Sequence, residues 1–213
     1  TRTNSKILKH GILAMTHLLT NIFPTPIIQI EFSHHEKYKF SNFSKKNKIP
    51  EGWETPIYTS FPNVTADDEF INWETICTLK KDLTEDINKA FIDMNIPTSW
   101  KFANLWYNFY YKNQGQHRHD HVNSLSESYF WSGIYFNKNP TTIKFYRKDL
   151  WSRTQNFPKS EDSALKESFY TYWTPDVFEG LILLFPPYLE HEVPLSTNDD
   201  MRLTFSFNML YGQ

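Results

Sequence analysis

The sequence predicts a mainly β, α+β fold, in which short strands form a sandwich or jelly roll and a helix packs against one sheet. Apolar residues recur at helical spacing between residues 72 and 94. After Pro97 the chain changes to short runs of β-branched and aromatic residues, separated by Gly, Pro, Asn or Asp. A helical segment followed by many strands is typical of this architecture.

The elements are expected in the following order. Residues 27–32 form a β-branched run bounded by prolines, which predicts a strand, and residues 33–66 are polar and predict loop. Residues 72–94 predict an amphipathic helix. The remaining strands are expected at residues 102–111, 129–136, 142–145, 169–173, 181–185 and 203–210. Residues 147–168 form a long insertion between strands, which is typical of a lid or substrate loop.

Length and composition indicate one domain. The 213 residues are 39% hydrophobic and 17% aromatic, which is ample material for a core. We expect residues 23–213 to form this domain, with its core in 100–210, and residues 1–22 to be an N-terminal extension or helix. The single cysteine, Cys77, excludes a disulfide framework and a multi-cysteine metal site, and it favours a cytoplasmic location.

Charge and hydropathy argue against two classes of partner. The formal net charge of −2 provides no basic field for phosphates, so we expect no nucleic acid. No stretch approaches the roughly twenty apolar residues of a membrane span, so we expect no membrane partner. Residues 7–19 could pass for a targeting signal, but Lys9, His10 and His17 interrupt them. Nothing in the sequence indicates an oligomeric state.

Histidines in the β region are candidate metal ligands. Four of them lie in or just before expected strands: His117, His119, His121 and His191. In an extended chain the first three point to one side, and Arg118 and Asp120 to the other. Two imidazoles from one strand and one from a distant strand are typical of an open metal site in a β fold. A His-rich surface loop is the alternative, and it is weakened because His191 follows a buried-strand pattern and a two-proline turn.

The last expected strand has a polar face and an apolar face. Its polar residues are Arg202, Thr204, Ser206 and Asn208, and they alternate with Leu203, Phe205, Phe207 and Met209. A polar face directed inward needs something to bind. Arg202 is suited to a bidentate grip on a carboxylate, with the Thr204 hydroxyl as a second donor. A solvent-facing edge strand is the alternative.

These residues belong to a series of motifs over residues 100–210. The motifs are Asn104-x-Trp106-x-Asn108-x-Tyr110, Gly115, His119-Asp-His121-Val-Asn123-Ser124, Trp131-Ser-Gly-Ile-Tyr-Phe136, residues 175–180, Leu184-Phe-Pro-x-x-x-x-His191-x-Val193 and Arg202-x-Thr204-x-Ser206-Phe-Asn208. In their order and spacing they resemble the 2-oxoglutarate/Fe(II) oxygenase superfamily, and within it a group of bacterial and phage proteins. Phe23-Pro-Thr-Pro26 also resembles the opening of that group.

The resemblance implies a double-stranded β-helix, which is a jelly-roll or cupin-like fold, with flanking helices. It implies a dioxygenase, by default a hydroxylase, that uses Fe(II), 2-oxoglutarate and O2, with ascorbate only as an addition in vitro. The superfamily holds its metal with a His-x-Asp/Glu pair and a distal histidine, and a later arginine binds the C5 carboxylate of 2-oxoglutarate. His191 and Arg202 match these last two roles. Thr204 would assist Arg202, and Asn108 or Tyr110 would contact the other end of the cosubstrate.

The first half of the ligand set departs from the superfamily pattern. Asp120 is adjacent to His119 and His121, so no His-x-Asp occurs here. Either His121 takes the carboxylate position, or a bulge turns Asp120 inward. Strand geometry favours His121. We therefore expect His119, His121 and His191 as metal ligands, with His117 and Asp120 in reserve.

Two other functions stay open. A cupin-like jelly-roll protein would hold zinc or no metal and bind a sugar or acidic ligand without oxidation, but it has no particular need of Arg202 downstream of His191. An interaction module would use the aromatic surface between Trp53 and Trp73. The sequence names no substrate. Residues 33–66 and 147–168 are expected to shape its pocket, with Trp151, Tyr170 and Trp173 as aromatic lining.

Overall fold

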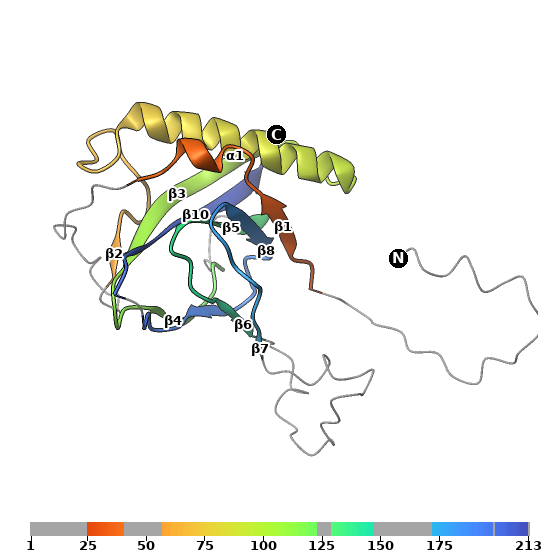
Figure 1. Cartoon of the computed structure of the whole chain (residues 1–213). Coiled ribbons are helices and arrows are strands. Elements are labelled where there is room, and N and C mark those ends of the chain that lie inside the picture. The colour runs from red at the N-terminus through yellow and green to blue at the C-terminus, as the bar shows by residue number, and fades with distance from the viewer. Residues whose placement is uncertain (1–24, 41–56, 123–128, 147–171, 198, 213) are drawn as a thin grey trace, which may run out of the picture.

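Two antiparallel sheets and one long helix build the protein (Figure 1). The computed structural model describes residues 25–40, 57–122, 129–146, 172–197 and 199–212. Their elements are β1 (Ile28–Glu31), η1 (His35–Lys37), β2 (Tyr58–Thr59), α1 (Trp73–Asp93), β3 (Trp100–Tyr110), β4 (Gln116–His119), β5 (Trp131–Lys138), β6 (Lys144–Tyr146), β7 (Tyr172–Trp173), β8 (Leu181–Phe185), β9 (His191–Val193) and β10 (Arg202–Tyr211). Among the helices of these residues, none is long and apolar enough to cross a membrane.

The larger sheet has six strands in the order β1-β8-β5-β10-β3-β2, and the smaller has four in the order β4-β9-β6-β7. In Figure 1 the larger sheet lies between α1 and the smaller sheet. β10 is central because it pairs with β3 on one side and β5 on the other. The alternative of a solvent-facing edge strand at residues 202–210 is therefore wrong.

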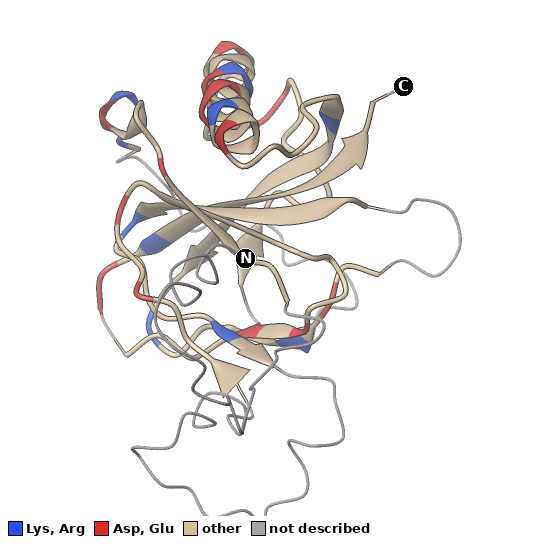
Figure 2. Ribbon diagram, turned by 90° about the vertical axis from the view of Figure 1, so that its right-hand side faces the viewer, with Lys and Arg blue, Asp and Glu red and all other residues tan. Residues whose placement is uncertain are grey.

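α1 confirms the expected amphipathic helix. It begins where the Asn72 side chain accepts a hydrogen bond from the Thr75 N–H at 2.7 Å, which satisfies one of the unpaired amides of the first turn. It ends at Met94, next to Asn95 with φ 56°. Figure 2 shows α1 above the larger sheet, with charged residues along it. Its buried apolar residues are Ile76, Leu79, Leu83, Ile87 and Phe91.

The two faces of β10 have separate roles. Leu203, Phe205, Phe207 and Met209 are fully buried and belong to the same apolar cluster as the inner face of α1. On the neighbouring strand β5, Gly133 lies against the Phe207 ring. A Cβ added at Gly133 would lie 2.2 Å from that ring, so the glycine leaves space for Phe207. The opposite face of β10 points between the two sheets, toward the site described below.

Most sequence-based expectations for the elements are confirmed. Residues 33–66, expected as loop, contain η1 and the two-residue strand β2 in their described parts. The segment around His119 was expected to be extended, and His191 was expected to open a strand; β4 and β9 pair as strands there. The expected insertion at 147–168, the extension at 1–22 and Trp53 lie outside the described residues.

Candidate metal centre

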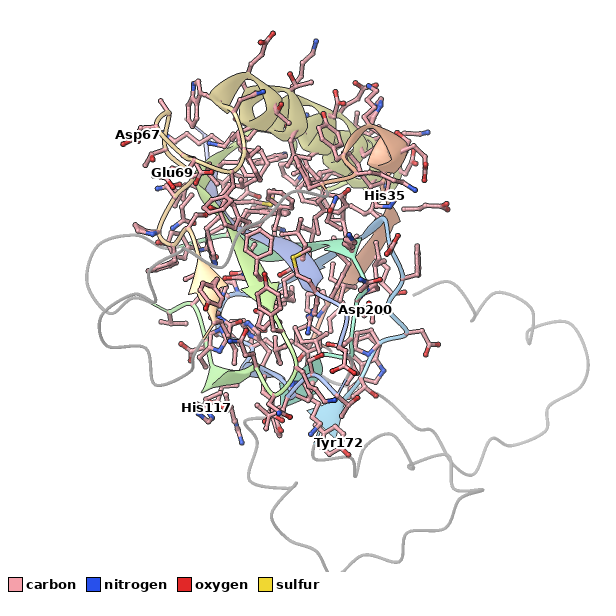
Figure 3. All side chains as sticks on the ribbon, turned by 60° about the vertical axis from the view of Figure 1, so that its left-hand side comes forward. His35, Asp67, Glu69, His117, Tyr172 and Asp200 are labelled. Atoms are coloured by element: carbon pink, nitrogen blue, oxygen red, sulfur yellow. The ribbon has the colours of Figure 1, made fainter. Side chains whose placement is uncertain are left out.

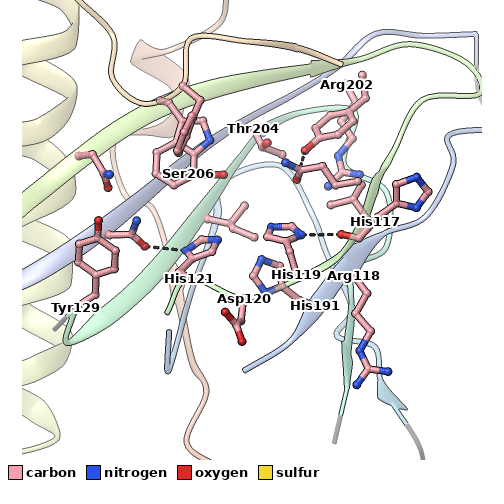
Figure 4. Close-up of a pocket in the computed structure, with 18 residues that line it drawn as sticks. His117, Arg118, His119, Asp120, His121, Tyr129, His191, Arg202, Thr204 and Ser206 are labelled. Atoms are coloured by element: carbon pink, nitrogen blue, oxygen red, sulfur yellow. Dashed lines mark hydrogen bonds between the residues drawn. The ribbon is translucent and has the colours of Figure 1, made fainter. Parts of the chain in front are cut away.

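Three imidazoles from two neighbouring strands meet between the sheets (Figure 4). His119 ends β4 and lies directly opposite His191, the first residue of β9. His121 follows β4, and its backbone N–H donates to the Pro187 carbonyl at 2.9 Å. One ring nitrogen from each of the three lies within 4.8 Å of the others. This brings together the ligands expected from the sequence.

Hydrogen bonds fix which nitrogen of each ring faces the centre. Nδ1 of His119 lies 2.7 Å from the His117 carbonyl oxygen, and Nδ1 of His191 lies 3.0 Å from the Leu189 carbonyl oxygen. Nδ1 of His121 lies 2.7 Å from Asn208 Oδ1, which also accepts the Ser132 hydroxyl. Because these oxygens are acceptors, each neutral ring carries its proton on Nδ1 and keeps a lone pair on Nε2. A metal-ligating histidine is usually held in this way.

The environment keeps these rings neutral. Burial, and after it the neighbouring His119, lower the pKa of His121 to about 4. Burial first, and then His119 and His121, hold the pKa of His191 well below its ordinary value. Burial also lowers the pKa of His119. Three lone pairs are therefore available at neutral pH.

His117 is among the residues that line the cavity, but its ring does not join the cluster of His119, His121 and His191. The β4–β9 register shifts between Gln116 and His119, because Gln116 pairs with Val193 and His119 with His191. Three steps along β4 thus correspond to two along β9, and this extra residue reverses the alternation. His117 is exposed, at the end of the molecule remote from α1 (Figure 3).

The bulge does not bring Asp120 into the cluster either. Asp120 lines the same cavity, where its Oδ1 accepts the Val122 N–H at 3.1 Å. The grouped ring nitrogens belong to His119, His121 and His191. Among the two arrangements considered from the sequence, the geometry matches the one with His121.

Arg202 is a buried cation at the other end of the cavity. Only 1% of it is exposed, and its guanidinium lies 4.7 Å from the centroid of the Tyr110 ring and 5.9 Å from that of Phe136. Nη1 donates to Thr141 Oγ1 at 2.5 Å, whereas Nε and Nη2 have no partner among the described residues. Burial lowers the pKa of Arg202 to about 10, so the guanidinium stays charged at neutral pH. A buried cation with two unsatisfied donors is suited to a carboxylate ligand.

The residues expected beside Arg202 are adjacent in the β3–β10 register. Tyr110 lies opposite Arg202, and Asn108 opposite Thr204. The Tyr110 hydroxyl donates to Gln116 Oε1 at 2.8 Å, and burial raises its pKa to about 12, which keeps it a phenol. Thr204 and Tyr110 line the cavity. Asn108 does not, and its amide instead donates to Ser206 Oγ at 3.1 Å.

A cavity of about 360 Å³ joins the imidazoles to Arg202. Its lining includes five residues to which sequence reasoning gave no role: Phe61, Asn104, Trp106, Gln116 and Tyr129. Asn104 and Trp106 could have been found, because they continue the alternation of Asn108 and Tyr110 along one strand. Trp173, expected as lining, is 43% exposed on β7 and does not line this cavity.

Residues 104–208, close to half of the 213 residues, match the model of a family described as "Putative 2OG-Fe(II) oxygenase". The match spans β3 to β10 and so contains the three imidazoles and Arg202. Over these residues the chain is similar to the 2OG-Fe(II) oxygenase superfamily. The cofactors of this superfamily are Fe(II), 2-oxoglutarate and O2. The resemblance inferred from the motifs is confirmed. No curated protein matches the chain.

Solved structures of HygX share the fold. HygX from Streptomyces hygroscopicus with nickel and 2-oxoglutarate bound is 13% identical, with a TM-score of 0.53 over 87% of this chain and 82% of that chain. HygX with nickel, 2-oxoglutarate and hygromycin B bound has a TM-score of 0.50 at the same identity and coverage. An oxidoreductase of the 2OG-Fe(II) oxygenase family from Burkholderia pseudomallei is 12% identical over 73% of this chain and 68% of that chain, with a TM-score of 0.47. The expected jelly-roll fold is confirmed.

Proposed function

We propose that this 2OG-Fe(II) oxygenase hydroxylates a C–H bond of its substrate, with His119, His121 and His191 as the ligands of Fe(II). One observation carries the proposal. One ring nitrogen from each of the three histidines lies within 4.8 Å of the other two, in the same cavity as a buried guanidinium with two donors that have no partner among the described residues. A cupin-like protein that only holds a metal would have no use for this cation.

The donor set fits Fe(II) and a dicarboxylate together. Three imidazoles suit Fe(II), although they also suit zinc, copper or nickel. They bring no negative charge, so one carboxylate of 2-oxoglutarate is left to offset charge at the metal ion and the other to offset the Arg202 guanidinium. Arg202, Thr204 and Tyr110 supply the site for the distal carboxylate, and Asn108 supports them through Ser206.

When bound, Fe(II) with 2-oxoglutarate and O2 supplies the oxidising chemistry, in which one oxygen atom enters succinate and the other enters the substrate, with release of carbon dioxide. The protein residues orient the reactants. The Nδ1 hydrogen bonds hold the three rings with Nε2 inward. The Arg202 guanidinium stays charged at neutral pH, and its Nε and Nη2 have no partner among the described residues, so they can donate to a carboxylate. Tyr110 stays a phenol and donates to Gln116. Burial of Arg202 and Thr204, 1% and 2% exposed, excludes water from that end.

The ligand assignment is tested by metal binding as well as turnover. Co(II) absorbs visible light when nitrogen ligands bind it, so it can be titrated into protein without Fe(II). We expect one equivalent to bind the wild type, and His191→Ala, His119→Ala and His121→Ala each to weaken binding at least about 100-fold. His117→Ala is the matched control, because His117 lies outside the cluster, and it should bind Co(II) as the wild type does.

Turnover of the cosubstrate is measured in the same variants. With Fe(II), ascorbate and 2-oxoglutarate, the wild type should form succinate slowly without substrate, and His191→Ala should not. Succinate formation that survives His191→Ala would overturn the ligand assignment. Tight Co(II) binding without any 2-oxoglutarate turnover would instead favour the cupin-like alternative.

We also propose a domain organisation and a cellular location. Residues 23–213 form one domain, supported by the shared core of α1, β1 and β10. The protein is cytoplasmic, which the single free Cys77 supports.

A further inference from the structure

The register of β3 and β10 divides the cavity floor into rows of facing residues. Along the two strands, the rows are Tyr110 with Arg202, Asn108 with Thr204, Trp106 with Ser206, and Asn104 with Asn208. The first row holds the buried cation. The last two rows carry no charged side chain. Figure 4 shows Arg202 on one side of the imidazoles and Tyr129 on the other.

A five-carbon dicarboxylate held at Arg202 does not reach the uncharged end. Residues on one face of a strand are spaced roughly 7 Å apart, so the Trp106–Ser206 row lies about 14 Å from the Arg202 row. A dicarboxylate of five carbons spans roughly 7 Å, as its C–C bond lengths dictate. The polar groups of the two distant rows therefore need a different ligand.

Two polar atoms at this end have no partner among the described residues: Trp106 Nε1 and Asn104 Oδ1. Both residues line the cavity, and Trp106 is only 4% exposed. Their neighbours are already engaged, since Asn208 Oδ1 accepts from Ser132 and faces His121, and Ser206 accepts from Asn108. Burying a donor and an acceptor without partners is unfavourable unless a ligand supplies them.

Aromatic rings flank this end of the cavity. The Phe61 ring meets the Trp106 ring edge-on, with centroids 5.2 Å apart and an interplanar angle of 87°. On its other side Trp106 lies 5.9 Å from the ring of His121, one of the proposed ligands. A group bound against Trp106 is thus placed beside the candidate metal centre.

We propose that Trp106 and Asn104 form a subsite for an uncharged carboxamide of the substrate. The amide carbonyl accepts the Trp106 Nε1–H, and the amide N–H donates to Asn104 Oδ1. A carboxylate lacks the donor, and an ammonium group lacks the acceptor. A planar amide also packs against the face of an aromatic ring. The proposal rests on the proposed function only in leaving the Arg202 end to 2-oxoglutarate.

The subsite can be probed without metal and without turnover. Four fragments of similar size are compared by ligand-observed NMR on the full chain, with saturating 2-oxoglutarate present so that benzoate cannot bind at Arg202: benzamide, benzoate, benzylamine and benzyl alcohol. Benzamide should bind at least about 5-fold more tightly than each of the other three, because only it supplies a separate acceptor and donor. Saturating 2-oxoglutarate should leave its dissociation constant unchanged.

Variants locate the binding. Trp106→Phe keeps a ring but removes the N–H, and Asn104→Leu removes the acceptor at similar size. Each should weaken benzamide about 5- to 10-fold. Trp173→Phe makes the same chemical change at an exposed tryptophan outside the cavity, and it should leave the affinity unchanged. Thermal unfolding checks that each variant is folded, and Asn104→Leu carries the test if the more buried Trp106→Phe does not fold.

Several results would overturn the proposal. These are no detectable benzamide binding, tighter binding of benzylamine, benzoate or benzyl alcohol, displacement of benzamide by 2-oxoglutarate, or an unchanged affinity in Asn104→Leu. Preference for benzylamine would assign this end to a cation recognised by Asp120, which lines the cavity nearby. The failure of the proposed function has a separate readout, because loss of Co(II) or 2-oxoglutarate binding does not affect benzamide binding in the apo protein.

Discussion

Replacing Arg202 by methionine should stabilise the ligand-free protein and at the same time abolish tight binding of 2-oxoglutarate. The wild type buries a guanidinium with two donors unsatisfied among the described residues, which is unfavourable until a carboxylate arrives. Methionine keeps most of the apolar stem and removes the charge. The opposite signs of the two effects distinguish a binding residue from a structural one.

The size of the stability change follows from the pKa of Arg202. Burial lowers it from 12.5 to about 10, so the folded state disfavours the charged form at every pH below that value. This corresponds to about 3 kcal/mol at neutral pH. Loss of the hydrogen bond to Thr141 and of the contact with the Tyr110 ring offsets roughly 1–2 kcal/mol. A net gain of about 1–2 kcal/mol raises Tm by roughly 2–8 °C in a protein of this size.

The effect on affinity has the opposite direction. Removing one partner of a buried, hydrogen-bonded charge pair costs about 2–5 kcal/mol. The Kd for 2-oxoglutarate should therefore rise roughly 30- to 5,000-fold. Saturating 2-oxoglutarate should raise the Tm of the wild type and leave that of Arg202→Met almost unchanged.

Thermal unfolding and calorimetric titration of 2-oxoglutarate measure both effects, with Mn(II) in place of Fe(II) to prevent turnover. Arg118→Met is the matched control, because the Arg118 guanidinium is 43% exposed and pairs with Glu190. Its Tm should change by less than about 2 °C, since exposed ion pairs contribute little. An Arg202→Met protein that is less stable than the wild type without ligand, or that keeps its affinity for 2-oxoglutarate, would refute this reasoning.

Three further substitutions test the surroundings of the site and the core. Asn208→Leu removes the oxygen that faces Nδ1 of His121, so Co(II) affinity measured by titration should fall about 10- to 100-fold. Gly133→Ala places a Cβ 2.2 Å from the Phe207 ring, and the resulting overpacking of about 1–3 kcal/mol should lower Tm by roughly 2–12 °C. Asp82→Asn should make the free energy of unfolding decrease less steeply as the pH is lowered into the acid range. Burial alone would raise the pKa of Asp82, but hydrogen bonds from Tyr38 and Lys37 hold it below its usual value, so its contribution is present at neutral pH and is lost as the pH falls through that folded-state pKa.

For each of these three substitutions, one result would contradict the prediction. Unchanged Co(II) affinity in Asn208→Leu would mean that the hydrogen bond does not orient His121. An unchanged Tm in Gly133→Ala would mean that the Phe207 ring can move aside at no cost. A wild-type and an Asp82→Asn protein that lose stability in parallel between neutral pH and acid would assign the acid limb to other carboxylates.

Periodic patterns made most of the fold predictable. The spacing of five apolar residues located α1 within a residue at each end, and the alternation along β10 identified both its core face and its pocket face. The same alternation correctly paired Arg202 with Thr204 on the inner side. These patterns are reliable because each follows from a regular backbone period.

Irregular backbone geometry limited how much of the site could be predicted from the sequence. The extra residue in β4 cannot be recognised from its sequence, so alternation grouped His117 with His119 and His121, whose cluster it does not join. Phe61 comes to the cavity from a segment with no periodic pattern, next to the short strand β2. The motif Asn104-x-Trp106 showed polar residues at the uncharged end, but only the structure shows that Trp106 Nε1 and Asn104 Oδ1 have no partner among the described residues.

The two halves of the site belong to strands of unequal stability. Arg202 and Thr204 belong to a ten-residue strand hydrogen-bonded on both sides and backed by the core beneath α1, whereas His119 closes a four-residue strand whose described ladder runs along β9 alone. Amides of β10 should exchange with solvent only when the whole molecule unfolds, and those of β4 through local opening. If His119, His121 and His191 hold the metal as proposed, we therefore expect a chelator to remove it from a protein that remains folded, and the site to bind metal again without refolding.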